Sequence, residues 1–186
     1  MPRWVQFCFA ILLLPVCIIP ILLIAVLVKS TSSGPAIHWS TRVGRNNTLF
    51  QMPKFRTMRT DAPDVATHLL TDSDRHITPV GKFLRKTSLD ELPQLWNVFK
   101  GDMVFVGPRP ALHNQDDLVK LRTDSGVHHL VPGITGWAQI NGRDALTIPN
   151  KVNLEIYYLQ NRSWMLDCKI LARTLFIVFK KINISH

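Results

Sequence analysis

The sequence predicts an α/β protein: a compact membrane-associated domain with an N-terminal membrane helix, a β-hairpin and amphipathic helices at the membrane surface. Three observations carry this prediction. Residues 4–28 contain no charged side chain, residues 32–61 have the pattern of two strands joined by a turn, and residues 163–182 are strongly apolar with interspersed basic residues. Apart from the first segment, the 186 residues allow one domain. We therefore expect a membrane helix at 1–29 and a single domain at 30–186.

The N-terminal segment is long enough to cross a bilayer, because its 25 residues would form a helix of about 37 Å against a hydrocarbon core of about 30 Å. It has no small-residue cleavage site, so we expect it to be retained. Pro15 and Pro20 each remove a backbone donor, and such prolines bend or break a helix. Arg3 and Lys29 place positive charge at both ends, so the charge gives no orientation. Two topologies stay open: a kinked spanning helix, and a re-entrant hairpin with both ends on one side.

Local signals divide the rest of the chain. A turn at Gly44–Asn47, followed by a strand at 48–56, predicts a β-hairpin. Residues 61–80 mix proline, aspartate and threonine and predict a surface loop with one short helix. Apolar residues at helical spacing between Leu92 and Phe99 predict a helix. After a stop at Gly101 we expect a short strand at 103–107, a polar helix around 113–125 and a C-terminal helix at the membrane surface bearing Lys169, Arg173, Lys180 and Lys181.

The charge of the chain points to anionic partners. Lysine and arginine number 22 against 13 acidic residues, a net charge of +9. Beside a membrane segment, this charge suits an anionic leaflet or phosphate-bearing ligands better than nucleic acid. The cysteines Cys8, Cys17 and Cys168 have no C-x-x-C spacing, which disfavours a zinc or dithiol site.

Two adjacent acids, Asp90 and Glu91, stand at the start of the helix expected around 92–99, in an apolar and basic neighbourhood. One interpretation is structural: with Ser88 they complete an S-x-x-E capping box. Pro93 counts against it, since a proline belongs in the donor-free first turn, which would make Asp90 the N-cap. A helix start favours an ionised Asp90 and leaves N–H groups for phosphate oxygens.

The second interpretation is chemical. One carboxylate attacks phosphorus, and the other holds the metal ion that neutralises the phosphates. Mg²⁺ fits best, because it binds through one or two carboxylates plus substrate phosphate. We therefore assign Asp90 and Glu91 as catalytic, one as the nucleophile and the other as the ligand of the metal. The candidate phosphate-binding cations are Lys54, Arg56, Arg85 and Arg109, the last fixed between two prolines.

Five stretches together resemble one family, the bacterial sugar transferases, or monotopic phosphoglycosyl transferases. They are KFRTM at 54–58, TSLDELPQLWNVFKGDM at 87–103, VGPRP at 106–110, PGITGWAQINGR at 132–143 and YYLQNRS at 157–163. The likeness runs from about Pro20 to near the C-terminus. Such a set is far more specific than any single motif.

The resemblance implies an enzyme that moves a sugar phosphate from a UDP-sugar onto polyprenyl phosphate, at the start of a surface glycan. It implies Asp90 as the nucleophile of a covalent phosphosugar intermediate, Glu91 in Mg²⁺ or acid–base work, and Arg109 as a phosphate ligand. It also implies a re-entrant first helix bent at Pro20, with residues 30–186 as a catalytic domain on the cytoplasmic face of a bacterial inner membrane. Ile19 departs from the family, where a serine commonly precedes that proline. The stretch ALHNQDDLVKLR favours an N-acetylated 6-deoxy hexosamine as the sugar, while the oligomeric state, a homodimer included, stays open.

Three further residues have two interpretations each. Trp137 would stack on uracil or anchor the protein at the interface. Asp167 would orient an arginine near the site or complement a helix dipole. Arg143 would bind phosphate or pair with Asp144.

Two rival functions compete with phosphoglycosyl transfer. Asp72 and Asp74 form a D-x-D pattern that would hold nucleotide-bound Mg²⁺ in a conventional glycosyltransferase, which releases UDP rather than UMP. The basic charge and the two apolar ends would also suit a non-enzymatic membrane-binding module. That second rival gives no reason for acids at a helix start.

Overall fold

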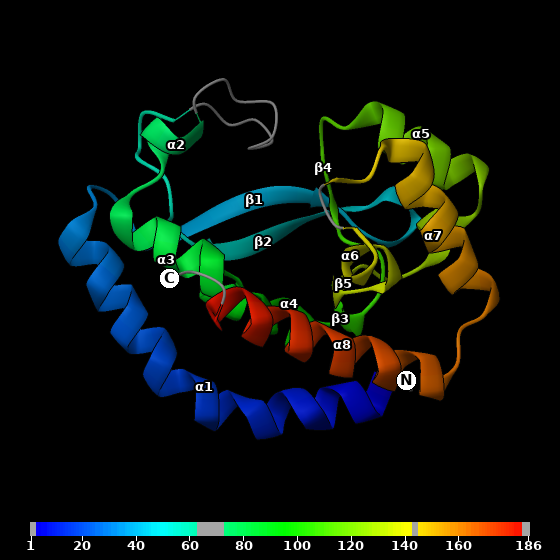
Figure 1. Ribbon diagram of the computed structural model, residues 1–186, viewed down its shortest axis with the longest axis horizontal. Coiled ribbons are helices and arrows are strands. Elements are labelled where there is room, and N and C mark those ends of the chain that lie inside the picture. Colours follow the sequence, from blue (N-terminus) through cyan, green and yellow to red (C-terminus); the bar gives the residue numbers. More distant parts are fainter. Residues whose placement is uncertain (1–2, 63–72, 143–144, 184–186) are drawn as a thin grey trace.

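The computed structural model of the protein describes residues 3–62, 73–142 and 145–183. Figure 1 shows a mixed α/β domain held against a long, bent N-terminal helix. With η marking 3₁₀-helices, the elements are α1 (Arg3–Thr31), β1 (Ile37–Val43), η1 (Arg45–Asn47), β2 (Leu49–Phe55), α2 (Ser73–His76), α3 (Pro79–Thr87), η3 (Leu89–Gln94), α4 (Leu95–Lys100), β3 (Val104–Val106), β4 (Ala111–Leu112), α5 (Asp116–Asp124), η4 (Val127–His129), β5 (Gly133–Thr135), α6 (Trp137–Ile140), α7 (Ile148–Gln160) and α8 (Trp164–Asn183).

Helix α1 is bent rather than broken. It runs without interruption through Pro15 and Pro20, and Figure 1 shows it curving around the domain with its concave side inward. Both arms touch the same domain: Gln6 and Ala10 are buried at one end, and Val28 at the other. The expected break is thus corrected to a bend, which packing on both arms stabilises.

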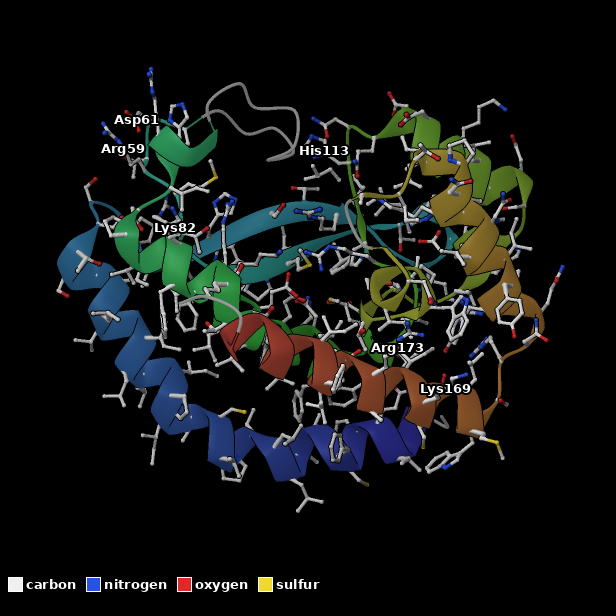
Figure 2. The ribbon with its side chains drawn as sticks, viewed as in Figure 1. Arg59, Asp61, Lys82, His113, Lys169 and Arg173 are labelled. Carbon is white, nitrogen blue, oxygen red and sulfur yellow. The ribbon has the colours of Figure 1, made fainter. Side chains whose placement is uncertain are left out.

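The outer face of α1 is apolar and exposed. Within the described part of the chain, Val5–Thr31 is the one helix long and apolar enough to cross a membrane, with a mean hydropathy of 3.3. In Figure 2 a row of α1 side chains projects from its convex side, away from the domain. The most exposed of the large apolar residues on this helix are Leu12, Val16, Ile19, Leu22, Leu23 and Val26.

Two small sheets support the loops of the domain. The predicted hairpin is confirmed: β1 and β2 pair antiparallel from Ile37↔Phe55 to Val43↔Leu49, and β4 adds a third strand beside β1. Strands β3 and β5 form a separate parallel pair, which was not predicted from the sequence. Gly107 and Gly133 allow these segments to meet, because a Cβ on Gly133 would lie 2.1 Å from the amide nitrogen of Gly107.

The helix that carries the acid pair differs from expectation. The chain forms the 3₁₀-helix η3 first, and the α-helix begins only at Leu95, ending at Gly101 in the left-handed region as predicted. Pro93 has no N–H, so no backbone hydrogen bond can run from residue 93 to an earlier carbonyl, and the α-helical ladder begins only after it. Ser88 has a left-handed backbone, and its side chain makes no cap hydrogen bond, so the capping box is not formed. The acids lie in the first turn of a 3₁₀-helix, not at an α-helix N-terminus.

The packing of η3 brings the acid pair close to α1. Leu89 and Leu92 pack against a cluster that contains Val28 of α1, Phe55 of β2 and Leu84 of α3. A larger cluster joins α4, β3, α7 and α8 in the middle of the domain. The apolar side chains on either side of Asp90 thus attach it to both the hairpin and the inner face of α1.

The C-terminal third is helical. Helix α8 confirms the predicted apolar C-terminal helix, and Figure 1 places it inside the curve of α1. Leu175 and Phe176 on α8 remain exposed. Helix α7 was not predicted, because its apolar positions are interrupted by asparagine and glutamate residues.

Candidate active site

Four segments bring together two carboxylates and three cations. Asp90 and Glu91 lie on η3, Lys54 on β2, Arg85 on α3 and Arg109 in the Pro-Arg-Pro segment between β3 and β4. Strand β2 packs directly on η3. All five were predicted from the sequence as candidate site residues, and the fold places them in one cluster, hereafter the acid–cation cluster.

Glu91 is bound by two cations. Its Oε1 accepts hydrogen bonds from Arg109 Nη2 at 2.7 Å and from Lys54 Nζ at 3.1 Å, while Oε2 lies 3.5 Å from Arg109 Nη1. The Glu91 side chain is 14% exposed. Burial alone would raise its pKa, but the charges and hydrogen bonds of Arg109 and Lys54 outweigh burial and hold the pKa of Glu91 well below its ordinary value. Glu91 is therefore ionised across the physiological range.

Asp90 has the opposite balance. The residue is 8% exposed. Burial raises the pKa of Asp90, the negative charge of Glu91 raises it further, and the nearby charges of Lys54, Arg109 and Arg85 only partly offset this. The two neighbouring carboxylates thus have pKa values shifted in opposite directions, as in sites where two acids perform different tasks. The sequence predicted that the dipole of an α-helix would favour an ionised Asp90; in the structure, burial and these side-chain charges shift its pKa instead.

The cations are fixed by their own partners. Arg85 Nε donates to Thr57 Oγ1 at 2.8 Å. Burial lowers the pKa of the Lys54 ammonium, and Glu91 counteracts that shift. An incoming diphosphate would meet two cations already held in position by one glutamate.

The Pro-Arg-Pro segment is anchored through its three carbonyl groups. Gly133 N donates to Pro108 O at 2.8 Å, Arg122 Nη2 donates to Arg109 O at 2.9 Å, and Arg42 Nη1 lies 3.4 Å from Pro110 O. Prolines have no N–H, so this segment depends on acceptors for its hydrogen bonds.

Asp90 and Glu91 are the two carboxylates of the acid–cation cluster that could hold a magnesium ion. Within the described residues no group of three or more His, Cys, Asp or Glu side chains is placed to hold a metal ion. Mg²⁺ commonly binds through one or two carboxylates plus substrate phosphates and water, and Asp90 and Glu91 can supply that number. The donor set therefore fits a metal that arrives with a diphosphate rather than one held in a protein cage.

Several of the candidate site residues lie away from the acid–cation cluster or outside the residues that the structure describes. Arg56 Nε donates to Pro35 O at 2.9 Å and secures the loop after α1 rather than joining the acid–cation cluster. Trp137 stacks on Tyr157 with ring centroids 5.3 Å apart, and Lys169 Nζ lies 5.7 Å from its centroid. Arg143, Asp72 and the side chain of Asp74 lie outside the described residues.

Asp167 belongs to a second polar region. It is buried in the first turn of α8 and accepts a hydrogen bond of 2.7 Å from Tyr158 Oη. That phenol also lies 3.3 Å from Val106 O. A cavity of about 250 Å³ opens here, lined in part by Gln6, Tyr158 and Asp167 and by none of the acid–cation cluster. Asp167 thus supports β3 through Tyr158.

A buried ion pair next to the site was not predicted from the sequence. Arg122 of α5 and Glu155 of α7 are joined by bonds of 2.6 and 2.8 Å and are 9% and 2% exposed at the side chain. Glu155 is the one acid of α7, and a lone acid among apolar neighbours is a sign of a buried, paired charge. The partner, 33 residues away, could not be read from the local pattern.

Comparison with known proteins identifies the family. The bacterial sugar transferase family matches residues 1–181. The chain is 44% identical over 167 residues to the uncharacterized sugar transferase EpsL of Bacillus subtilis, covering 89% of this chain and 80% of that protein. It is 41% identical over 160 residues to the UDP-glucose:undecaprenyl-phosphate glucose-1-phosphate transferase of Escherichia coli, covering 82% of this chain and 34% of that protein. It is 38% identical over 156 residues to the UDP-N-acetylgalactosamine-undecaprenyl-phosphate N-acetylgalactosaminephosphotransferase of Aeromonas hydrophila, covering 81% and 37%. The chain thus spans about a third of the length of the latter two relatives, and it belongs to the bacterial sugar transferase family.

Proposed function

We propose that the protein transfers a sugar 1-phosphate from a UDP-sugar to polyprenyl phosphate, undecaprenyl phosphate in particular, and releases UMP. This would be the first membrane step in the synthesis of a surface polysaccharide or other glycan. The family, and relatives whose names specify undecaprenyl phosphate as acceptor, support this reaction class. The single structural observation that carries it is the buried Asp90 carboxylate among the charges of Lys54, Arg85 and Arg109.

The first half-reaction is an attack by Asp90. A carboxylate oxygen of Asp90 forms a bond to the β-phosphorus of the UDP-sugar. The bond between that phosphorus and the oxygen bridging to the α-phosphate breaks, and its electron pair leaves with UMP. The sugar phosphate is then an acyl phosphate on Asp90. Burial leaves the carboxylate poorly hydrated, which favours nucleophilic attack, while the three cations favour its ionised form.

The second half-reaction returns the enzyme to its starting state. A phosphate oxygen of the polyprenyl phosphate attacks the phosphorus of the adduct. The bond to the Asp90 oxygen breaks, the carboxylate is regenerated, and a polyprenyl diphosphate sugar is formed. The same cations that met the first diphosphate can stabilise the charge that develops here.

Glu91 and the cations bind and orient the phosphates. Arg109 and Lys54 would donate to phosphate oxygens in place of some of their bonds to Glu91, which frees a carboxylate oxygen. Mg²⁺, when bound through Glu91 and the phosphates, would neutralise charge on the leaving group. The opposite pKa shifts of Asp90 and Glu91 support separate roles rather than a shared proton.

Membrane association supports the choice of a lipid acceptor. The outer face of α1 carries the exposed apolar residues, and Trp96 and Phe99 of α4 are also exposed, 51% and 42%. Both arms of α1 pack on one domain, which favours a re-entrant helix with both ends on the cytoplasmic side over a helix that spans. Figure 2 shows Arg59, Asp61 and His113 at the top of the domain, on the side opposite the convex face of α1, where water would lie. The contact of η3 with α1 would let Asp90 meet a lipid phosphate at the membrane surface.

The identity of the sugar calls for an experiment. The names of the relatives specify glucose, galactose and N-acetylgalactosamine, and the stretch at 111–122 favours an N-acetylated hexosamine. We expect the purified protein, given undecaprenyl phosphate and a panel of UDP-sugars, to release UMP with one of them. Release of UDP would instead support a conventional glycosyltransferase, and no release with any sugar would support a binding module.

A further inference from the structure

Arg109 is held at two points that belong to different parts of the molecule. Its guanidinium binds Glu91 at 2.7 Å on the side of the acid–cation cluster. Its backbone carbonyl accepts a hydrogen bond of 2.9 Å from Arg122, which arrives from α5 on the other side. The segment carries prolines before and after Arg109, so neither neighbour can donate a backbone hydrogen bond.

Arg122 is itself fixed by Glu155. Its Nε and Nη2 reach the two carboxylate oxygens of Glu155 at 2.8 and 2.6 Å, a bidentate arrangement that sets the plane of the guanidinium. Both side chains are nearly inaccessible to water, 9% and 2% exposed. The same Nη2 that binds Glu155 also binds the Arg109 carbonyl. A buried guanidinium with this geometry has little freedom to rotate, so the carbonyl it holds is fixed as well.

We infer that Arg122, oriented by Glu155, is a positioning residue for Arg109 in the binding of the substrate diphosphate. The identity of the substrate in this inference rests on the proposed function, whereas the contacts among Arg109, Arg122 and Glu155 do not depend on it. Arg122 meets the acid–cation cluster at the backbone carbonyl of Arg109, so the Arg122–Glu155 pair acts through the Pro-Arg-Pro backbone. Displacing a catalytic or binding group by about 1 Å can cost on the order of 100-fold in rate, and the carbonyl that Arg122 holds belongs to the residue whose side chain must meet the phosphate.

The variant Arg122→Lys separates positioning from folding. A lysine keeps a positive charge for Glu155, so the buried carboxylate is not left alone, but its single ammonium replaces the planar fork that joins Glu155 to the Arg109 carbonyl. We expect the KM for the UDP-sugar and the dissociation constant for UDP to rise about 10-fold or more. A purely structural role would lower the active fraction, and thus the apparent kcat, without changing KM. Lys120→Met is the matched control, because Lys120 lies on the same helix and forms an exposed ion pair with Asp124.

A double-mutant cycle with Arg109→Ala decides the matter. UDP binding is measured for the wild type, Arg122→Lys, Arg109→Ala and the double variant, with thermal unfolding recorded for each. If Arg122 acts through Arg109, Arg122→Lys will weaken UDP binding in the wild type and change it by less than about 2-fold when Arg109 is already alanine. Equal losses in both backgrounds, or no loss in the single variant, would overturn the inference. Sugar-phosphate transfer by the wild type is measured separately: its absence with every sugar would count against the proposed function, whereas the UDP cycle would still decide the positioning role.

Discussion

Glu91 Oε1 accepts a hydrogen bond of 2.7 Å from the guanidinium of Arg109 and a second one of 3.1 Å from the ammonium of Lys54. A carboxylate here presents to both cations the kind of oxygen that a phosphate would present. Binding of a diphosphate must therefore compete with Glu91 for two cations. This competition gives Glu91 two tasks in succession, first holding Arg109 and Lys54 in place and then, in the proposed reaction, binding metal.

The metal requirement of the reaction tests whether Glu91 binds a metal ion. Because the described residues form no metal cage, we expect Mg²⁺ to bind with the diphosphate and to leave readily. Transfer should stop in EDTA and return when Mg²⁺ is added in excess. Turnover that persists undiminished in chelator would remove the metal from the proposal and leave Glu91 only its contacts with Arg109 and Lys54.

Substitution of the two acids should have opposite effects on stability. Burial raises the pKa of Asp90, so its charge opposes folding at neutral pH, and Asp90→Asn should leave the free energy of unfolding unchanged or increase it. Glu91→Gln removes the charge that compensates Lys54 and Arg109, and breaking a buried pair in this way costs about 3 kcal/mol. Chemical denaturation in detergent compares the three proteins. A lower stability for Asp90→Asn than for Glu91→Gln would contradict the electrostatic account.

The pH dependence of stability follows from the same shifts. The depressed pKa of Glu91 stabilises the fold above the ordinary glutamate pKa of about 4.3, and this contribution is lost as pH falls through the folded-state value. The raised pKa of Asp90 acts in the reverse sense: its protonated form stabilises the fold at low pH, and that contribution is lost as pH rises through the folded-state value.

The rate of adduct formation should fall on the acid side at a pH set by Asp90. Its pKa is raised, so we expect the midpoint to lie above the ordinary aspartate value of about 3.9. Single-turnover measurements of UMP release at several pH values give this midpoint, with circular dichroism at each pH to verify folding. A midpoint at or below the ordinary value would mean that Asp90 is not desolvated in the working enzyme.

Cysteine labelling tests the re-entrant topology. In a protein whose three native cysteines are replaced, single cysteines at position 2 and at Ser33 should both resist a membrane-impermeant reagent in cells whose inner membrane is intact. Both should react after that membrane is opened, together with a reference cysteine at the exposed Lys120. Labelling of position 2 from the periplasm alone would establish a spanning helix instead.

Local chemistry explains what the sequence could predict. The hairpin followed from the turn at Gly44–Asn47, and the stop of α4 from Gly101, because turn and cap residues act over a few neighbours. The 3₁₀ form of η3 was missed, since the apolar spacing after Leu92 predicts a helix without indicating where the α-helical ladder can begin. Helix α7 was missed because its polar residues interrupt the periodicity.

Long-range pairing explains what the sequence could not predict. Lys54 was identified as a candidate by its charge, and Arg109 by its charge and its flanking prolines. Their shared contact with Glu91 depends on β2 packing against η3. The same applies to Arg56, which resembles Lys54 in the sequence and instead binds a carbonyl next to α1. The Arg122–Glu155 pair forms because α5 packs beside α7, and the local sequence around either residue does not predict that packing.

The most direct test of the central claim is the mass of the protein after mixing with UDP-sugar in the absence of lipid acceptor. If Asp90 attacks the β-phosphorus, wild-type protein will gain the mass of one sugar phosphate as one equivalent of UMP appears, and a peptide containing Asp90 will carry the adduct. Asp90→Asn keeps the size of the side chain and should remain folded, form no adduct and catalyse no transfer. Wild-type transfer activity in folded Asp90→Asn protein would contradict the account.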